Sequence, residues 1–155
     1  MTWLVPLVGL VGALIVAVAN YLVQRWRYRI DRLSAAIDHL CGEINEVADL
    51  ATSYWLLDAG QNDQRAQARA IEPRLIGKQM RLDQLFNALT VVDPKFSASA
   101  AEELLPEFYD KISGGEFLGS HRAPGLTRAK EVQHIAAELN GALRQEVGHR
   151  ARDWR

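Results

Sequence analysis

The sequence predicts an all-α protein, in which an N-terminal single transmembrane helix continues into an antiparallel cytoplasmic four-helix bundle. Residues 3–23 form an apolar run without a charged side chain, and a run of roughly 20 such residues matches the hydrocarbon core of a bilayer. The rest of the chain repeats apolar residues at helical spacing and does not alternate them for long, as a strand would. We therefore expect a membrane anchor over residues 1–24 and a helical bundle over residues 25–155.

An arginine cluster directly follows the apolar run. Its members are Arg25, Arg27, Arg29 and Arg32. Flanking arginines stay on the cytoplasmic side, so we expect the N-terminus outside the cell (inner) membrane and the bundle in the cytoplasm. The single Cys41 agrees with a reducing compartment. A cleaved signal peptide is the alternative, since Ala17 and Ala19 resemble a cleavage site, but no Lys or Arg precedes the run.

The clearest periodicity follows the arginines and predicts one helix from the membrane to about Leu57. Its apolar residues alternate in steps of three and four: Ile30, Leu33, Ile37, Leu40, Ile44, Val47, Ala51 and Tyr54. Such a heptad is either the buried seam of an intramolecular bundle or the interface of a parallel coiled-coil dimer. Three further amphipathic segments need cover, which favours the bundle. Gly60 is expected to cap the end of the helix.

Three more helices are expected. The second covers about residues 62–89, with a kink or break caused by Pro73. The third covers about residues 97–112, with Ser97 or Ser99 as its N-cap. A glycine-rich loop over residues 113–125 follows, and a fourth helix runs to about residue 152, capped by Thr127.

Two groups of residues are expected to contact the membrane. Small residues recur every fourth position at Gly9, Ala13 and Ala17, a pattern that lets two membrane helices approach closely. An up-down bundle would also return the C-terminal Arg152 and Trp154 to the arginine cluster and its Trp26, beside anionic lipid. The alternative for this C-terminal end is a solvated tail.

Aromatic and aliphatic residues also gather at the far end of the predicted bundle. Tyr54 and Trp55 end the first helix, while Phe117 and Leu118 lie in the long loop. They either close the core at this end or form an exposed patch for a partner protein. The seam position of Tyr54 favours closure of the core.

No set of residues predicts catalysis, a cofactor or a metal. Two Glu-x-x-His spacings, at Glu131 and Glu146, lie on one predicted helix, whereas a di-metal bundle takes them from two helices. His134 is expected to face solvent, Cys41 to be a buried thiol, and Asp38, His39 and Glu43 to form a solvated face. The net charge of −1 argues against nucleic-acid binding.

The predicted function is non-enzymatic. We expect a membrane-anchored helical bundle that acts by protein–protein interaction or assembly at the inner face of the membrane, as a homo-oligomer or as one subunit of a membrane complex. An oligomerising membrane-acting effector or toxin is the first alternative, although Asn20 is the only polar side chain among residues 4–20 of the run. A ligand-sensing or di-metal bundle is the second alternative.

Overall fold

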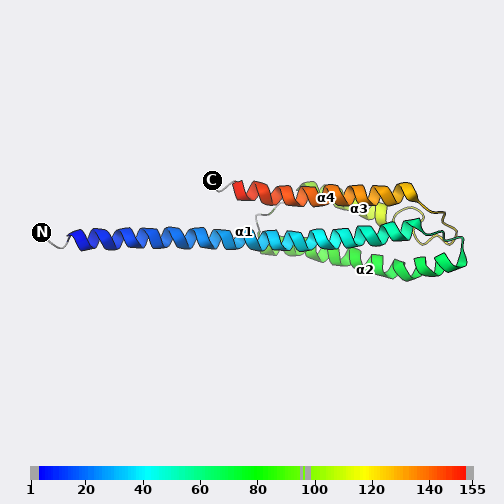
Figure 1. Cartoon of the computed structure of the whole chain (residues 1–155), viewed down its shortest axis with the longest axis horizontal. Coiled ribbons are helices and arrows are strands. Elements are labelled where there is room, and N and C mark those ends of the chain that lie inside the picture. The colour runs from blue at the N-terminus through cyan, green and yellow to red at the C-terminus, as the bar shows by residue number, and fades with distance from the viewer. Residues whose placement is uncertain (1–3, 95, 97–98, 153–155) are drawn as a thin grey trace.

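The computed structural model describes residues 4–94, 96 and 99–152, with side chains described from residue 10 onward except at residue 11. It contains four helices: α1 (Leu4–Leu56), α2 (Asn62–Val92), α3 (Ser99–Ser113) and α4 (Leu126–Arg152). No strand occurs among the described residues. The helices run alternately up and down, and the N-terminal half of α1 projects well beyond the other three (Figure 1). The predicted all-α bundle is confirmed.

The heptad on α1 is the centre of the bundle. Its members from Leu33 to Tyr54 are at most 1% exposed within the single chain. The seam is therefore covered intramolecularly, as the bundle interpretation requires, and a coiled-coil partner is not needed to bury it. A buried Leu or Ile side chain contributes about 1.5–3 kcal/mol, so this seam is a large part of the folding free energy.

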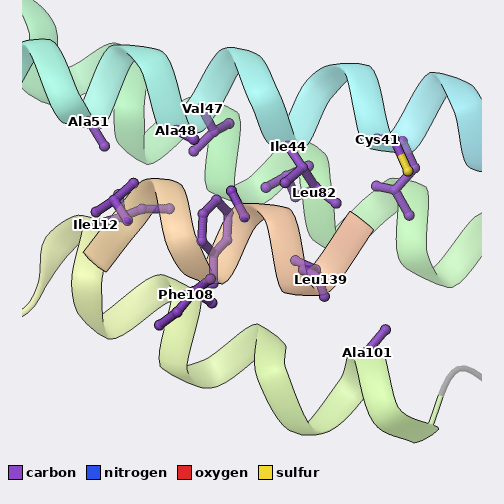
Figure 2. Packing of buried hydrophobic residues seen from close by; sticks show 14 of the residues in the cluster. Cys41, Ile44, Val47, Ala48, Ala51, Leu82, Ala101, Phe108, Ile112 and Leu139 are labelled. Carbon is purple, nitrogen blue, oxygen red and sulfur yellow. The ribbon is translucent and has the colours of Figure 1, made fainter. Parts of the chain in front are cut away.

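The other helices pack around α1 in a defined order. Helix α1 contacts α2 and α4, α4 also contacts α3, and α2 touches α3 only weakly. Figure 2 shows Phe108 of α3 and Leu139 of α4 beneath Ile44 and Val47 of α1, with Leu82 of α2 completing the cluster. Apolar side chains from all four helices therefore share one core.

Antiparallel register between α1 and α4 is visible in two polar contacts. Asn140 Nδ2 donates to Asn45 Oδ1 at 2.7 Å, and Gln133 Nε2 donates to Asp49 Oδ1 at 3.1 Å. Later residues of α4 thus lie beside earlier residues of α1, so the two helices are antiparallel. This register carries the C-terminal end of α4 back to the start of the projecting segment (Figure 1).

Several expected helix ends differ in detail. Helix α2 continues through Pro73, so the break is wrong; the carbonyl that loses its partner belongs to Arg69, which is exposed and open to water. Helix α1 ends at an Asx turn, in which the Gly60 N–H donates to Asp58 Oδ1 at 2.9 Å. Gly60 does not have the positive φ of a C-cap glycine, which among described glycines belongs to Gly115 at 64°.

The first residues of α3 and α4 could not be determined from the sequence. Helix α4 begins at Leu126, one residue before the expected cap Thr127, because the Gly125 carbonyl already accepts the first helical hydrogen bond, from the Ala129 N–H at 2.9 Å. Helix α3 begins at Ser99, and the alternative cap Ser97 lies outside the described residues.

The expected transmembrane span is not confirmed. Within the described part of the chain, none of the helices combines the length and the apolar character needed to cross a membrane. The apolar run begins at Trp3, outside the described residues, and the side chains of residues 4–9 and 11 also lie outside them.

Candidate functional site

Among the described side chains, which begin at residue 10, the projecting part of α1 carries exposed apolar residues on every side. The consecutive residues Leu14, Ile15 and Val16 are 60–63% exposed, and Leu10 is 71% exposed. Consecutive residues point about 100° apart on a helix, so exposure at three in a row leaves no protected face. Soluble proteins rarely expose a large continuous apolar surface. We call this part of α1, residues 10–23, the apolar segment.

Ala13 and Ala17 of the small-residue stripe lie within this segment, and Gly9 directly precedes it. Gly9 is part of α1, while Ala13 and Ala17 are exposed and have no second helix beside them in the single chain. The helix is thus open to a neighbouring helix at Ala13 and Ala17, and the packing role of the stripe stays a prediction.

The four arginines lie between the apolar segment and the bundle. Arg25, Arg27, Arg29 and Arg32 are all exposed. None of them has an ion-pair partner among the residues that the structure describes. We call these four residues the collar. It marks the level at which the exposed apolar surface ends and the packed bundle begins.

Aromatic residues accompany the collar, and α4 returns to it. Trp26 is half-buried, whereas Tyr28 is 68% exposed. Counted from the Asn140–Asn45 pair, Arg152 corresponds in register to Leu33 of α1. Arg152 is exposed, and within the described part of the chain it donates only to the Gly148 carbonyl of its own helix, at 3.2 Å. Trp154 lies outside the described residues.

The far end of the bundle is closed by aromatic rings. Tyr54 is 0% exposed and Trp55 is 3% exposed. The Tyr54 ring centroid lies 5.0 Å from that of Phe117, and the Tyr54 hydroxyl accepts from the Leu118 N–H at 3.0 Å. Phe117 is half-buried and Leu118 exposed. Tyr54 and Trp55 thus belong to the core, which leaves Leu118 as the exposed apolar residue of the expected patch.

Arg122 is a buried residue that the sequence analysis did not single out. Its Nη2 donates to the Tyr54 carbonyl at 2.8 Å, and its guanidinium carbon lies 3.9 Å from the Tyr54 ring centroid and 4.9 Å from that of Trp55. Its Nε and Nη1 have no partner among the described residues. The cation therefore sits at the negative C-terminal end of α1, where carbonyls and π faces stabilise it.

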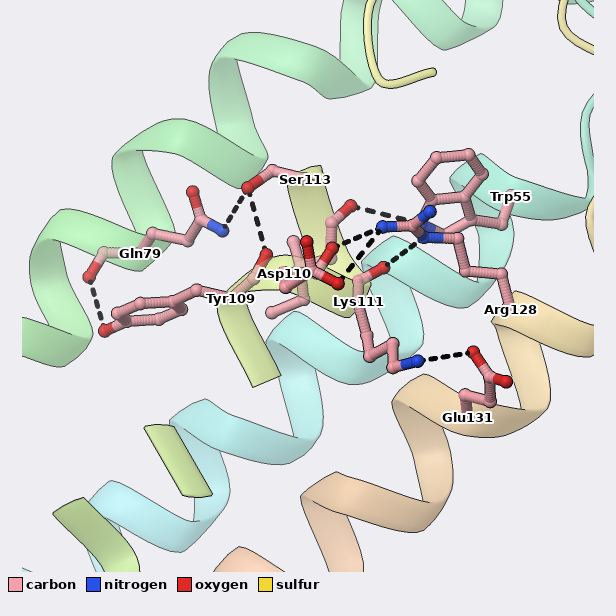
Figure 3. Close-up of polar contacts among 9 residues, drawn as sticks. Trp55, Gln79, Tyr109, Asp110, Lys111, Ser113, Arg128 and Glu131 are labelled. Atoms are coloured by element: carbon pink, nitrogen blue, oxygen red, sulfur yellow. Dashed lines mark hydrogen bonds and ion pairs between the residues drawn. The ribbon is translucent and has the colours of Figure 1, made fainter. Parts of the chain in front are cut away.

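Arg128 plays the same role at the end of α3 (Figure 3). Its Nε donates to the Lys111 carbonyl at 3.0 Å, and a second donor bonds the Asp110 carbonyl. Trp55 Nε1 donates to the Ile112 carbonyl at 3.1 Å, beneath the Arg128 guanidinium. Arg122 therefore binds the loop to the end of α1, and Arg128 binds the first turn of α4 to the end of α3.

Glu43 departs from the predicted solvated face. It is 6% exposed and pairs with Lys78 at 2.9 Å and with Arg81 at 2.8 Å, both on α2. Hydrogen bonds to Glu46 and Glu43 raise the pKa of Lys78, and the bond to Lys78 lowers the pKa of Glu46. This cluster joins α1 to α2. Asp38 and His39 are exposed, as expected.

The residues weighed for catalysis and metal binding are not brought together. Cys41 is 1% exposed, and burial raises the pKa of its thiol, which disfavours the nucleophilic thiolate. The His134 side chain is 74% exposed and lies 3.5 Å from Glu138, while Glu131 pairs with Lys111 at 3.0 Å. The described residues contain no group of three or more side chains placed to hold a metal ion.

No protein-family model, curated protein or solved structure matches the chain. The functional argument therefore rests on the apolar segment, the collar and the bundle.

Proposed function

We propose that this chain is a non-enzymatic, membrane-anchored helical-bundle protein that acts by protein–protein interaction or assembly at the inner face of the cell membrane. In this proposal the apolar N-terminal part of α1 lies in the bilayer with its N-terminus outside. The bundle is held in the cytoplasm, immediately beneath the headgroups.

The exposure of the apolar segment is the observation that carries the proposal. Burying a Leu, Ile or Val side chain contributes about 1.5–3 kcal/mol, and Leu10, Leu14, Ile15, Val16 and Leu22 are each at least half exposed. A bilayer offers apolar cover to every side of the helix at once. A helix also satisfies its own backbone hydrogen bonds, which lipid requires.

The collar supports the orientation. Arginines next to a membrane segment favour the cytoplasmic side, and these four begin two residues after Val23. The exposed Tyr21 and Tyr28 flank the start of the collar, where aromatic rings favour the membrane interface. An opposite orientation would carry these four arginines across the bilayer.

Two observations favour interaction over chemistry. The candidate nucleophile Cys41 is enclosed in the core, away from the exposed His39. The Ala13 and Ala17 side of the apolar segment is open to close helix packing, which favours a homo-oligomer or a subunit of a membrane complex.

Membrane extraction tests the anchor. We expect the full chain to stay with membranes after washing at alkaline pH, and Leu14→Arg with Val16→Arg to release much of it, because each arginine costs about 2.5–3.5 kcal/mol at a membrane helix centre. The matched control is Met80→Arg together with Ile76→Arg, at exposed apolar residues of α2. Complete release of the unaltered chain by the wash would overturn the proposal.

The mass of the protein in detergent tests the proposed assembly. The full chain, extracted in mild detergent, is expected to have a protein mass above that of one 17.3 kDa chain. A strictly monomeric mass with no co-purified protein, at concentrations near those in the membrane, would contradict it.

A further inference from the structure

The base of the bundle combines basic residues from both ends of the chain. The collar comes from α1, and the antiparallel register brings Arg152 of α4 to the level of Leu33. Figure 1 shows the C-terminal end of α4 beside α1, where the projecting segment begins. Residues separated by more than a hundred positions in sequence therefore share one level of the molecule.

This concentration of positive charge is local. The whole chain has 18 Lys and Arg against 19 Asp and Glu, yet Asp31 is the one acidic residue from Arg25 to Leu33. Arg25, Arg29 and Arg32 follow the spacing i, i+4 and i+7, which places them on one side of α1. In the described chain these arginines have no carboxylate partner, so they repel one another unless anions from outside the chain lie nearby.

Arg150, a nearby arginine of α4, differs from the collar arginines because a carboxylate neutralises it. Arg150 Nη2 lies 2.9 Å from Asp93 Oδ2, and this pair joins the end of α4 to the end of α2. The pair fixes the last turn of α4 against the bundle. Arg152, two residues later, is thereby held at the base with its cation exposed.

We infer that the base of the bundle is a binding surface for anionic phospholipid headgroups, formed jointly by the α1 collar and by Arg152 of α4. The inference rests on the proposed anchoring, which sets the collar at headgroup depth. Guanidinium groups bind phosphate and carboxylate oxygens with paired hydrogen bonds. The half-buried Trp26 lies within the collar and reports on the lipid next to it.

The experiment measures which lipid surrounds Trp26. The full chain carrying Trp3→Phe and Trp154→Phe is reconstituted in phosphatidylcholine vesicles that contain a small fraction of either brominated phosphatidylserine or brominated phosphatidylcholine. Bromine quenches tryptophan fluorescence on contact, and Trp55 is 3% exposed at the far end of the bundle. The ratio of the two quenching efficiencies gives the local preference for the anionic lipid.

We expect a severalfold preference for phosphatidylserine, with each arginine in contact supplying up to about fivefold, the equivalent of ~1 kcal/mol per basic residue. Arg29→Ser with Arg32→Ser is expected to lower the ratio strongly, and Arg152→Ser alone is expected to lower it by a smaller factor. The matched control is Arg69→Ser with Arg74→Ser, at exposed arginines of α2. Salt near 1 M, where the Debye length is about 3 Å, is expected to abolish the preference.

The outcomes distinguish the membrane anchoring from the headgroup-binding surface. Equal quenching by both lipids would leave the anchor standing and overturn the headgroup surface. An unchanged ratio in Arg152→Ser would overturn the joint surface, since α4 would then contribute nothing. Quenching by neither lipid would place Trp26 away from a bilayer and would contradict the proposed anchoring itself.

Discussion

The guanidinium carbon of Arg122 lies 3.9 Å from the ring centroid of Tyr54, and the same guanidinium donates to the Tyr54 carbonyl at 2.8 Å. One cation thus binds both the side chain and the backbone at the end of α1. The Ala59 N–H returns a bond to the Arg122 carbonyl at 2.9 Å. These contacts hold the loop over the bundle, and none of the carboxylates that the structure describes forms an ion pair with Arg122.

Arg122→Ala is expected to destabilise the bundle by about 2–4 kcal/mol. It removes a desolvated cation–π contact and a charged hydrogen bond to a helix C-terminus. Chemical denaturation of the full chain in detergent measures the loss, and Arg74→Ala, at an exposed arginine, is the control. Equal stability of the two variants would show that the Arg122 contacts contribute nothing net.

Ile37→Asp or Leu139→Asp is expected to unfold the bundle. The two residues are 1% and 0% exposed, and an unpaired charge there costs several kcal/mol against a total stability of about 5–15 kcal/mol. Circular dichroism and protease sensitivity report the loss. Leu126→Asp, at a residue 59% exposed, is the control and is expected to stay folded.

His134→Ala is expected to change stability by less than about 0.5 kcal/mol, because its side chain is 74% exposed. Glu131→Ala removes the ion pair with Lys111 and is expected to cost about 0–1 kcal/mol. Elemental analysis of the purified protein complements both variants. Stoichiometric metal that disappears in His134→Ala would reveal a metal site in this helix.

The bundle is expected to lose stability as the pH rises above about 10. Burial, and then the 2.7 Å hydrogen bond to Asp83, raise the pKa of Tyr109 far above its ordinary value. The unfolded chain releases this proton near pH 10 while the folded chain retains it, so alkaline pH favours unfolding. Burial raises the pKa of Tyr54 as well.

Tyr109→Phe isolates this contribution. Its stability is expected to fall less steeply with pH above about 10 than that of the unaltered chain. Tyr28→Phe is the control, because Tyr28 is 68% exposed and lies between the collar arginines of α1. This variant should keep the original slope. Identical slopes in all three chains would exclude Tyr109 as a source of the alkaline sensitivity.

The helices and the core were predictable because they depend on local periodicity. The spacing of three and four on α1 predicted the buried residues from Leu33 to Tyr54. The same helical spacing at Val132, Ile135, Leu139 and Leu143 marks the inner face of α4 in the sequence. The start of the predicted glycine-rich loop matches the end of α3, where Gly115 has a φ of 64°. Each of these signals lies within a few residues of the feature that it determines.

The polar interior was not predictable in the same way. In the sequence, Glu43 directly precedes the seam residue Ile44 and carries no sign of burial. Its side chain is buried because α2 brings Lys78 and Arg81 to it. Arg122 lies in a loop without periodicity, and its position depends on the rings at the end of α1. Contacts between distant segments determine both residues, so no local pattern marks them.

The central claim is that the apolar segment lies within a bilayer while the bundle stays outside it. Proteinase K digestion of the full chain in sealed vesicles, with urea added to unfold the bundle, tests this most directly. We predict that a fragment ending near the collar, at about Arg25, survives in vesicles and disappears when detergent dissolves them. Digestion of that fragment in intact vesicles as fast as in detergent would contradict the account.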